Sequence, residues 1–249
     1  MASSKKKKEN CNSFSEFTSN RRSFSSKSIL GISFEGNPEQ RELIRLINQN
    51  NIPVIYCFGD AGTGKTFTSI AAAIDLVKIQ KKYNKIFYIR EPLEVGKSLG
   101  YLPGSIEEKF EAYCGGLIDN IETISQLSGL NKNDMLSSIE CLPPQYTRGR
   151  SFLPGSILII DEAQNLSLDS LHTLLTRFGQ FCKVILLGSC NQIDIKGASK
   201  ENNDFMKSFE ILESIDEEVV VGSVTLVQSE RSKYCRMIDQ AFTKYKENK

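Results

Sequence analysis

Residues 57–66 read Cys-Phe-Gly-Asp-Ala-Gly-Thr-Gly-Lys-Thr, which fits the pattern G-x-x-x-x-G-K-[ST]. A short apolar run, 53–58, precedes this stretch, and apolar residues at helical spacing follow it over 66–80. A strand, a glycine-rich loop and a helix in this order cradle phosphate, because loop N–H groups and the helix N-terminus supply positive potential. A glycine-rich turn that carries Lys-Thr by chance is the weaker alternative. We therefore predict a nucleotide-phosphate site.

The residue types in the loop indicate separate roles. Lys65 is expected to reach the terminal phosphates, and the Thr66 hydroxyl is expected to ligate magnesium. The predicted nucleotide contacts from this stretch are Gly59, Asp60, Ala61, Gly62, Thr63, Gly64, Lys65, Thr66 and Phe67.

Two acids follow a second apolar run about a hundred residues downstream. Asp161 and Glu162 come directly after 157–160, which lacks alternation and so predicts a strand buried on both faces. Asp161 is expected to hold magnesium directly or through water, and Glu162 to polarise the attacking water as general base. A surface turn is the weaker alternative.

Phosphoryl transfer also needs positive charge near the developing γ-phosphate charge. Arginines at predicted strand or helix ends are the candidates, and the sequence alone does not choose among Arg90, Arg148, Arg150, Arg177 and Arg231.

Composition narrows the class of protein. The 249 residues suffice for one substantial core, and 40% hydrophobic with 24% charged residues is ordinary for a soluble globular protein. No apolar run approaches the roughly 20 residues of a membrane helix, and no apolar segment of a secretory signal follows the basic start. Seven cysteines without a C-x-x-C pair and a single histidine, His172, favour reduced thiols in the cytoplasm and no zinc site.

The first 30 residues differ from the rest. They hold seven of the 31 Lys and Arg residues and two of the 30 Asp and Glu residues, so the tail is basic and the body is net negative. We predict a disordered tail over 1–30, which is either an electrostatic arm for nucleic acid or a solvated end.

Apolar runs that alternate with helical patterns predict an α/β fold: three layers with a mostly parallel sheet. One domain is expected over 31–249, with an irregular helical insertion at about 91–156. Within it, helical patterns over 106–114 and 117–127 and a strand at 139–142 are expected. Asn37 and Gln40 have the spacing of a capping box at the start of the first helix.

The chain resembles the PhoH-like family of P-loop ATPases, which is related to the core of superfamily 1 helicases. The motifs that carry the resemblance run in family order over most of 35–231; the segment 90–104, REPLEVGKSLGYLPG, is the most specific of them. The others are 37–40, 59–66, 148–152 (RGRSF), 160–165 (IDEAQN), 175–179, 187–188 and 191–194.

The resemblance implies roles for particular residues. Gln40 would contact the adenine edge and favour ATP, beside its capping role, and Gln192 would sense the γ-phosphate or the attacking water. Arg231 resembles an arginine finger, Arg177 would line the cleft, and Arg90 lies where related helicases contact a nucleic-acid strand. With Arg90, the nucleic-acid candidates are Arg148 and Arg150.

One position departs from the family pattern. The family usually has Gly-Asp after the strand that ends at Leu187, and this chain has Gly188-Ser189. Since serine carries no charge, we expect the departure to affect the coupling of hydrolysis to movement more than nucleotide binding. We expect Ser189→Asp to raise ATP turnover.

These features predict a magnesium-dependent ATPase that acts on RNA or single-stranded DNA. About 18 residues follow Arg231, too few for a second helicase core, so a homo-oligomer is expected to complete the cleft. Ribonuclease activity is not expected, because residues 1–30 cannot form an RNA-cleaving domain. The alternative is a slow ATP-dependent switch or stress regulator that acts through a protein partner; a small-molecule kinase is a weaker third possibility.

Overall fold

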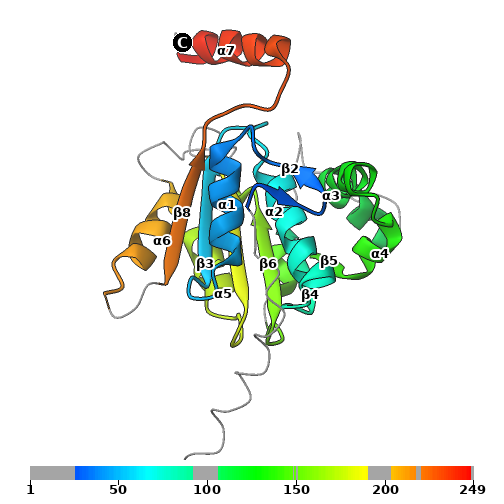
Figure 1. The fold of residues 1–249 in the computed structure, drawn as a ribbon. Coiled ribbons are helices and arrows are strands. Elements are labelled where there is room, and N and C mark those ends of the chain that lie inside the picture. Colours follow the sequence, from blue (N-terminus) through cyan, green and yellow to red (C-terminus); the bar gives the residue numbers. More distant parts are fainter. Residues whose placement is uncertain are drawn as a thin grey trace, which may run out of the picture.

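The computed structural model describes residues 26–91, 106–147, 149, 151–189, 203–216 and 220–247. At its centre is a six-stranded sheet with the order β5-β4-β6-β7-β3-β8, in which all neighbouring strands are parallel (Figure 1). The strands are β3 (Val54–Gly59), β4 (Lys85–Arg90), β5 (Ile139–Leu142), β6 (Ser156–Asp161), β7 (Lys183–Gly188) and β8 (Val221–Leu226).

Helices cover both faces of this sheet, which confirms the predicted α/β fold. Alternate residues of β3 point to opposite faces: Ile55 and Cys57 enter one core, and Tyr56 and Phe58 enter the other. On the first face lie α1 (Pro38–Asn48), α2 (Lys65–Ile74) with its π-helical end η2 (Asp75–Ile79), and α3 (Ile106–Ser128). On the second lie η4 (Ala163–Asn165), α5 (Leu168–Leu175) and α6 (Asp204–Glu213). The remaining helices are α4 (Lys132–Ser137), η3 (Pro144–Thr147) and α7 (Lys233–Glu247).

The register of the sheet brings distant motifs to one edge. Arg90 at the end of β4 pairs with Asp161 at the end of β6, and Phe58 of β3 pairs with Gly188 at the end of β7. Parallel strands end on the same side, so the loops that follow β3, β4, β6 and β7 share the carboxyl edge of the sheet.

The first helix begins as predicted but with half of a capping box. Asn37 Oδ1 accepts a hydrogen bond from Gln40 N at 3.0 Å, and Pro38 occupies the first turn. The Gln40 side chain does not return to Asn37; its Nε2 donates to Thr63 O of the phosphate loop at 3.1 Å. The cap therefore uses the backbone of Gln40, and the side-chain amide of Gln40 bonds with the phosphate loop.

The insertion contains one long helix where the sequence predicts two shorter helical segments. α3 continues through Gly115 and Gly116 because Leu117, Ile121 and Ile124 on its next turns are buried in the first core. This burial outweighs the roughly 1 kcal/mol helix penalty of each glycine. Among the helices of the described residues, none is long and apolar enough to cross a membrane.

The predicted domain boundary at residue 30 falls within a small hairpin. β1 (Ser28–Ile29) pairs antiparallel with β2 (Ile32–Ser33), and Ile29 is buried. The folded domain therefore includes residues on both sides of this boundary.

The structure contradicts the prediction of reduced thiols for one pair of cysteines. Cys114 of α3 and Cys141 of β5 form a disulfide. The two residues are 27 positions apart, and only the packing of α3 beside the edge strand brings them together. Cys57 and Cys182 are buried free thiols, and Cys235 is an exposed one.

Candidate nucleotide and catalytic site

The phosphate loop turns from β3 into α2 with the conformation that its glycines permit. Gly62 and Gly64 have φ values of +81° and +86°, in the left-handed region. Lys65 Nζ lies over the loop and donates to Gly59 O at 2.7 Å and to Asp60 O at 3.0 Å. The lysine ammonium group is therefore held at the mouth of the loop, where phosphate oxygens are the stronger acceptors.

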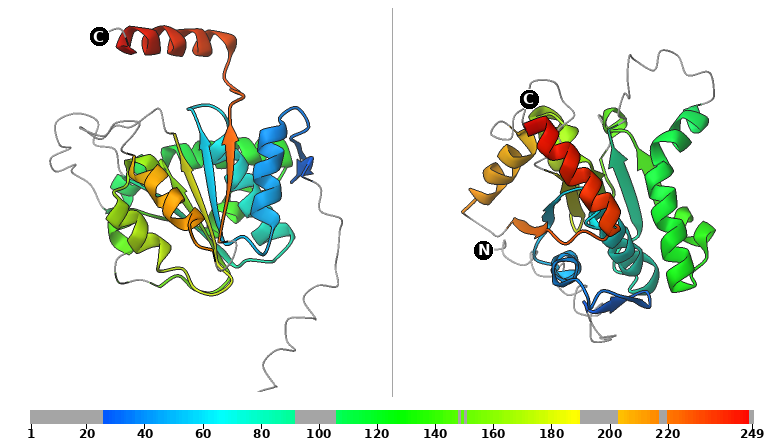
Figure 2. Two further views of the ribbon diagram at one scale, coloured as in Figure 1. Left: turned by 90° about the vertical axis from the view of Figure 1, so that its left-hand side faces the viewer. Right: turned by 90° about the horizontal axis from the view of Figure 1, so that it is seen from above.

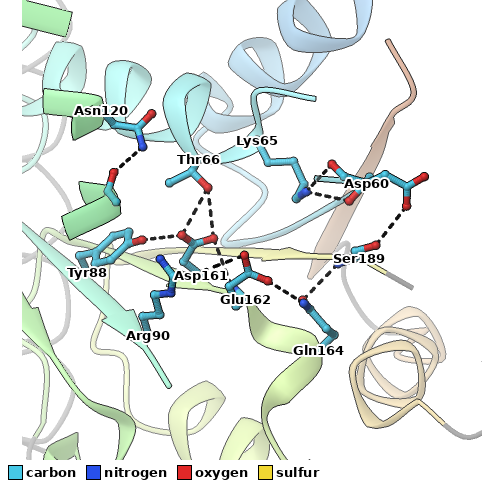
Figure 3. Close-up of polar contacts among 12 residues, drawn as sticks. Asp60, Lys65, Thr66, Tyr88, Arg90, Asn120, Asp161, Glu162, Gln164 and Ser189 are labelled. Carbon is cyan, nitrogen blue, oxygen red and sulfur yellow. Dashed lines mark hydrogen bonds and ion pairs between the residues drawn. The ribbon is translucent and has the colours of Figure 1, made fainter. Parts of the chain in front are cut away.

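Two predicted metal ligands meet beside this loop. Thr66 Oγ1 lies 3.2 Å from Asp161 Oδ1 and 3.3 Å from Oδ2 (Figure 3). The Tyr88 hydroxyl donates to Asp161 Oδ2, and Glu162 N donates to Oδ1. Burial raises the pKa of Asp161, while the hydrogen bond from Tyr88 and the charge of Arg90 oppose this shift. Tyr88 and Arg90 thus favour the ionised carboxylate that a metal requires.

The arrangement suits magnesium better than a metal that needs a complete protein cage. Thr66 and Asp161 offer a hydroxyl and a carboxylate, the oxygen donors that Mg²⁺ prefers. In the described part of the chain, no group of three or more His, Cys, Asp or Glu residues could hold a metal. Mg²⁺ usually takes one or two protein ligands and completes its shell with waters and substrate phosphates, so this pair fits it.

The predicted general base lies next to the metal pair. Glu162 leaves β6 with φ of +53°, a left-handed conformation that is uncommon outside glycine. Its Oε2 accepts a hydrogen bond from Gln164 Nε2 at 2.6 Å, and its Oε1 lies 3.9 Å from Arg90 Nη2. Two neighbours therefore fix the direction of this carboxylate (Figure 3).

Arg90, predicted to contact nucleic acid, lies among the acids of the site. Burial alone would lower its pKa, but Tyr88, Asp161 and Glu162 together raise the pKa and keep the guanidinium charged. A side chain at Gly116 of α3 would press on Arg90 Nη1, at 3.2 Å from an added Cβ. Glycine at position 116 of the helix therefore leaves space for the Arg90 side chain.

A chain of hydrogen bonds links the base to the phosphate loop. Gln164 Oε1 accepts from Ser189 N at 3.1 Å, and Ser189 Oγ lies 3.1 Å from Asp60 Oδ1 (Figure 3). The IDEAQN motif contains Gln164, and the sequence analysis assigned it no role. Tyr88, likewise missed, is two residues before Arg90 on β4, so strand alternation places both side chains on one face.

Residues from the far end of the chain cover the other side of the loop. Glu230 N donates to Gly62 O at 2.8 Å, and Glu230 Oε1 accepts from Asn37 Nδ2 at 2.7 Å. Arg231, the predicted arginine finger, packs so closely on Gly62 that any side chain there would clash with it. Gln40 contacts Gly64 in the same way. The structure thus brings Gln40 and Arg231 to the loop; no sequence pattern pointed to Glu230.

The structure does not bring Arg177 into this group. It follows α5 in the connection that leads to the start of β7, where its main chain bonds with Leu174 and Phe152. The start of β7 is at the amino edge of the sheet, and the phosphate loop is at the carboxyl edge. Gln192, Arg148, Arg150 and the 96–104 stretch lie outside the described residues.

Comparison with known proteins places the chain in a family. The profile described as "PhoH-like protein" matches residues 35–243. Protein PhoH2 of Bacillus subtilis (strain 168) is 35% identical over 200 residues, covering 79% of this chain and 44% of that protein. The PhoH-like protein of Mycobacterium tuberculosis (strain H37Rv) is 31% identical over 208 residues, covering 84% and 57%. The chain thus spans about half the length of these relatives.

Solved helicase structures show weaker overall similarity. Pif1 helicase from Candida albicans aligns with a TM-score of 0.40 and 17% identity over 81% of this chain and 42% of that one. The helicase domain of Pyrococcus furiosus Hef aligns with a TM-score of 0.41 and 14% identity over 80% and 39%. The extent of the family match and its agreement with the phosphate loop lead to one conclusion: this chain belongs to the PhoH-like protein family.

Proposed function

We propose that this protein binds ATP with magnesium and hydrolyses it. The observation that carries the proposal is the convergence of Thr66 and Asp161 within 3.2 Å, beside the phosphate loop and next to Glu162. A nucleoside triphosphate bound to the loop would have its terminal phosphate between Lys65 and the two acids, Asp161 and Glu162. This is the arrangement that phosphoryl transfer to water requires.

Each residue has a defined task in this mechanism. The loop N–H groups and Lys65 bind and orient the phosphates, and Thr66 and Asp161 hold the metal. When bound, Mg²⁺ neutralises charge on the β- and γ-phosphate oxygens. Glu162 orients the water and takes its proton, while Arg90 and Gln164 keep the carboxylate in place. Arg231, already on Gly62, is available to stabilise charge at the γ-phosphate.

Steady-state ATPase assays with two variants test this assignment. Lys65→Ala should abolish both nucleotide binding and turnover, because it removes the phosphate-binding cation. Glu162→Gln should still bind ATP with magnesium but lose turnover by about 10²–10⁴-fold, the range for a lost general base. A Glu162→Gln protein that hydrolyses ATP at the wild-type rate would refute the assignment of the base.

We further propose that hydrolysis is coupled to RNA or single-stranded DNA in the cytoplasm, within a homo-oligomer. The family membership and Arg90 at the site support coupling, and the basic tail and Arg148 with Arg150 are additional candidate contacts. ATPase rates should rise with added RNA or single-stranded DNA, and salt should weaken the stimulation because phosphate contacts release counterions. Lys65→Ala should remove it.

A slow ATP-dependent switch is the second candidate function. The observation in its favour is that Glu162 is already engaged by Arg90 and Gln164, which restrains a base from approaching water. In that case ATP turnover would stay slow with or without nucleic acid, and ATP binding would alter affinity for a protein partner. The nucleic-acid stimulation assay separates the two functions.

A further inference from the structure

The disulfide between Cys114 and Cys141 ties α3 to the edge strand β5, close to the two acids of the site. Cys141 is the Cα partner of Tyr88 on β4, and paired residues of neighbouring strands point to the same face of the sheet. Tyr88 in turn donates its hydroxyl hydrogen bond to Asp161. α3 runs along this end of the sheet, beside β4 and away from α6 (Figure 2). One end of the disulfide therefore borders a side chain that positions the proposed metal ligand.

The other end of the disulfide is close to Arg90. Cys114 precedes Gly116 by two residues in α3, and a Cβ added at Gly116 would lie 3.2 Å from Arg90 Nη1. Through Nη2 the same guanidinium lies 3.9 Å from Glu162 Oε1. One arginine thus contacts both the helix and the proposed general base, so the position of α3 limits where the guanidinium can lie.

Breaking the disulfide would release one part of α3 and leave the rest in place. Leu117, Ile121 and Ile124 follow the disulfide in the helix and are buried in the first core. This part of α3 therefore stays packed in either redox state. Gly115 and Gly116 lie between it and Cys114, and glycine is a poor helix former. The turn beside Arg90 can accordingly open once Cys114 is released.

We propose that the Cys114–Cys141 pair is a redox-controlled clamp on the catalytic site. The disulfide keeps Arg90 beside Glu162, and reduction to two thiols releases Arg90 and lowers ATP turnover. The inference rests on the proposed ATPase and adds its regulation by redox state. We also propose that the protein acts in the cytoplasm, where disulfides are usually transient and serve catalysis or redox sensing.

Thiol–disulfide exchange with a small thiol reductant would open the clamp. Cys141 is partly exposed and Cys114 is only 6% exposed, so the reductant thiolate attacks Sγ of Cys141. The S–S bond breaks, and Cys114 leaves as a thiolate that takes up a proton. A second reductant thiol then cleaves the mixed disulfide and frees Cys141. Two reductant thiols become one disulfide while the protein disulfide becomes two thiols, and exchange with a small disulfide reverses the reaction.

Steady-state ATPase rates of the oxidised and the reduced protein test the clamp. Each form is prepared with oxidised or reduced dithiothreitol, its thiols are counted by labelling, and circular dichroism checks that it is folded. Reduction should lower kcat by about tenfold, as for the loss of other residues that orient a group at a metal site. KM for magnesium–ATP should change little, because the contacts of Lys65 with the phosphate loop do not involve α3.

Three variants show whether the effect depends on this pair and on Arg90. The Cys114→Ser/Cys141→Ser variant should have the kcat of the reduced wild type under both conditions. Cys235→Ser, which removes an exposed free thiol, is the matched control and should respond like wild type. Arg90→Gln should have the same kcat in both redox states. A disulfide that only stabilised the fold would keep its effect in Arg90→Gln.

Several results would overturn the clamp. They are a wild-type kcat that reduction leaves unchanged or raises, a response that persists in Arg90→Gln or in the double serine variant, and a pair that stays reduced in oxidised dithiothreitol.

Hydrogen exchange separates this inference from the proposed ATPase, because it needs no turnover. The backbone amides of 114–117 should exchange faster in the reduced protein. Faster exchange in a protein that does not hydrolyse ATP would refute the ATPase and leave the redox movement of α3 standing. An active ATPase whose turnover and amide exchange are both insensitive to reduction would refute the clamp alone.

Discussion

Ser189 Oγ and Asp60 Oδ1 are 3.1 Å apart, within hydrogen-bonding distance across the ends of two neighbouring parallel strands. Asp60 belongs to the phosphate loop after β3, and Ser189 directly follows β7. The same serine donates its backbone N–H to Gln164, which in turn holds Glu162. The loop and the proposed base are thus joined through the residue that departs from the family pattern.

This contact changes what Ser189→Asp should do. A carboxylate at position 189 would face that of Asp60, and two like charges at this distance repel. We expect Ser189→Asp to raise ATP turnover only when Asp60→Asn removes the second charge. The double variant should exceed the single one by about tenfold, equivalent to about 1.4 kcal/mol. Steady-state ATPase rates of wild type, both single variants and the double variant measure this coupling, and equal gains in the single and double variants would contradict it.

Tyr88→Phe should shift the pH dependence of activity. Burial raises the pKa of Asp161, and the Tyr88 hydrogen bond opposes that rise. Without the hydroxyl the pKa rises further, so the carboxylate ionises at higher pH and the acidic limb of the ATPase profile moves upward. Apparent affinity for magnesium should fall by about tenfold, as for other residues that orient a metal ligand. Tyr83→Phe, a half-buried tyrosine between η2 and β4, is the matched control and should leave the profile in place.

Lys183 should make stability depend on alkaline pH. The side chain is 1% exposed, and its Nζ donates to Gln49 O and Ile52 O. Burial lowers the pKa of Lys183 from 10.5 to about 8, so the unfolded chain binds more protons between these values. The free energy of unfolding should therefore rise from pH 8 to 10.5, by up to about 3 kcal/mol.

Urea unfolding of wild type and Lys183→Met at several pH values measures this effect. The variant should lose the rise that wild type shows over this range. Parallel curves for the two proteins would rule out titration of Lys183 as its cause.

Reduction should destabilise the protein through Cys114 and Cys141. A disulfide that closes a loop of this length contributes about 3.5 kcal/mol to the free energy of unfolding. Urea unfolding with and without reductant should differ by this amount in wild type, and the Cys114→Ser/Cys141→Ser variant should not respond. Thiol labelling of the denatured chain should find two fewer reactive cysteines before reduction than after it. Equal labelling would show that the pair is reduced.

The sequence was sufficient to predict those features of the protein that depend only on neighbouring residues. Periodicity predicted the strand before the phosphate loop and the strand that ends in the two acids, and Asn37 caps α1 as its residue type indicates. The phosphate loop and the Asp161–Glu162 pair could be predicted because each lies at the end of an apolar run. Parallel strands then require these ends to meet at one edge of the sheet.

Only the tertiary structure showed the contacts between segments that are far apart in the sequence, because no sequence pattern relates such segments. It placed Arg90 beside Glu162, left Arg177 in the connection to β7, and joined two cysteines expected to be reduced. The Gly115–Gly116 pair continues a helix because packing against the core outweighs local propensity. The local sequence was thus sufficient to identify the phosphate loop and the two acids. Only the packed sheet, which sets the distances between strand ends, decided which side chains position them.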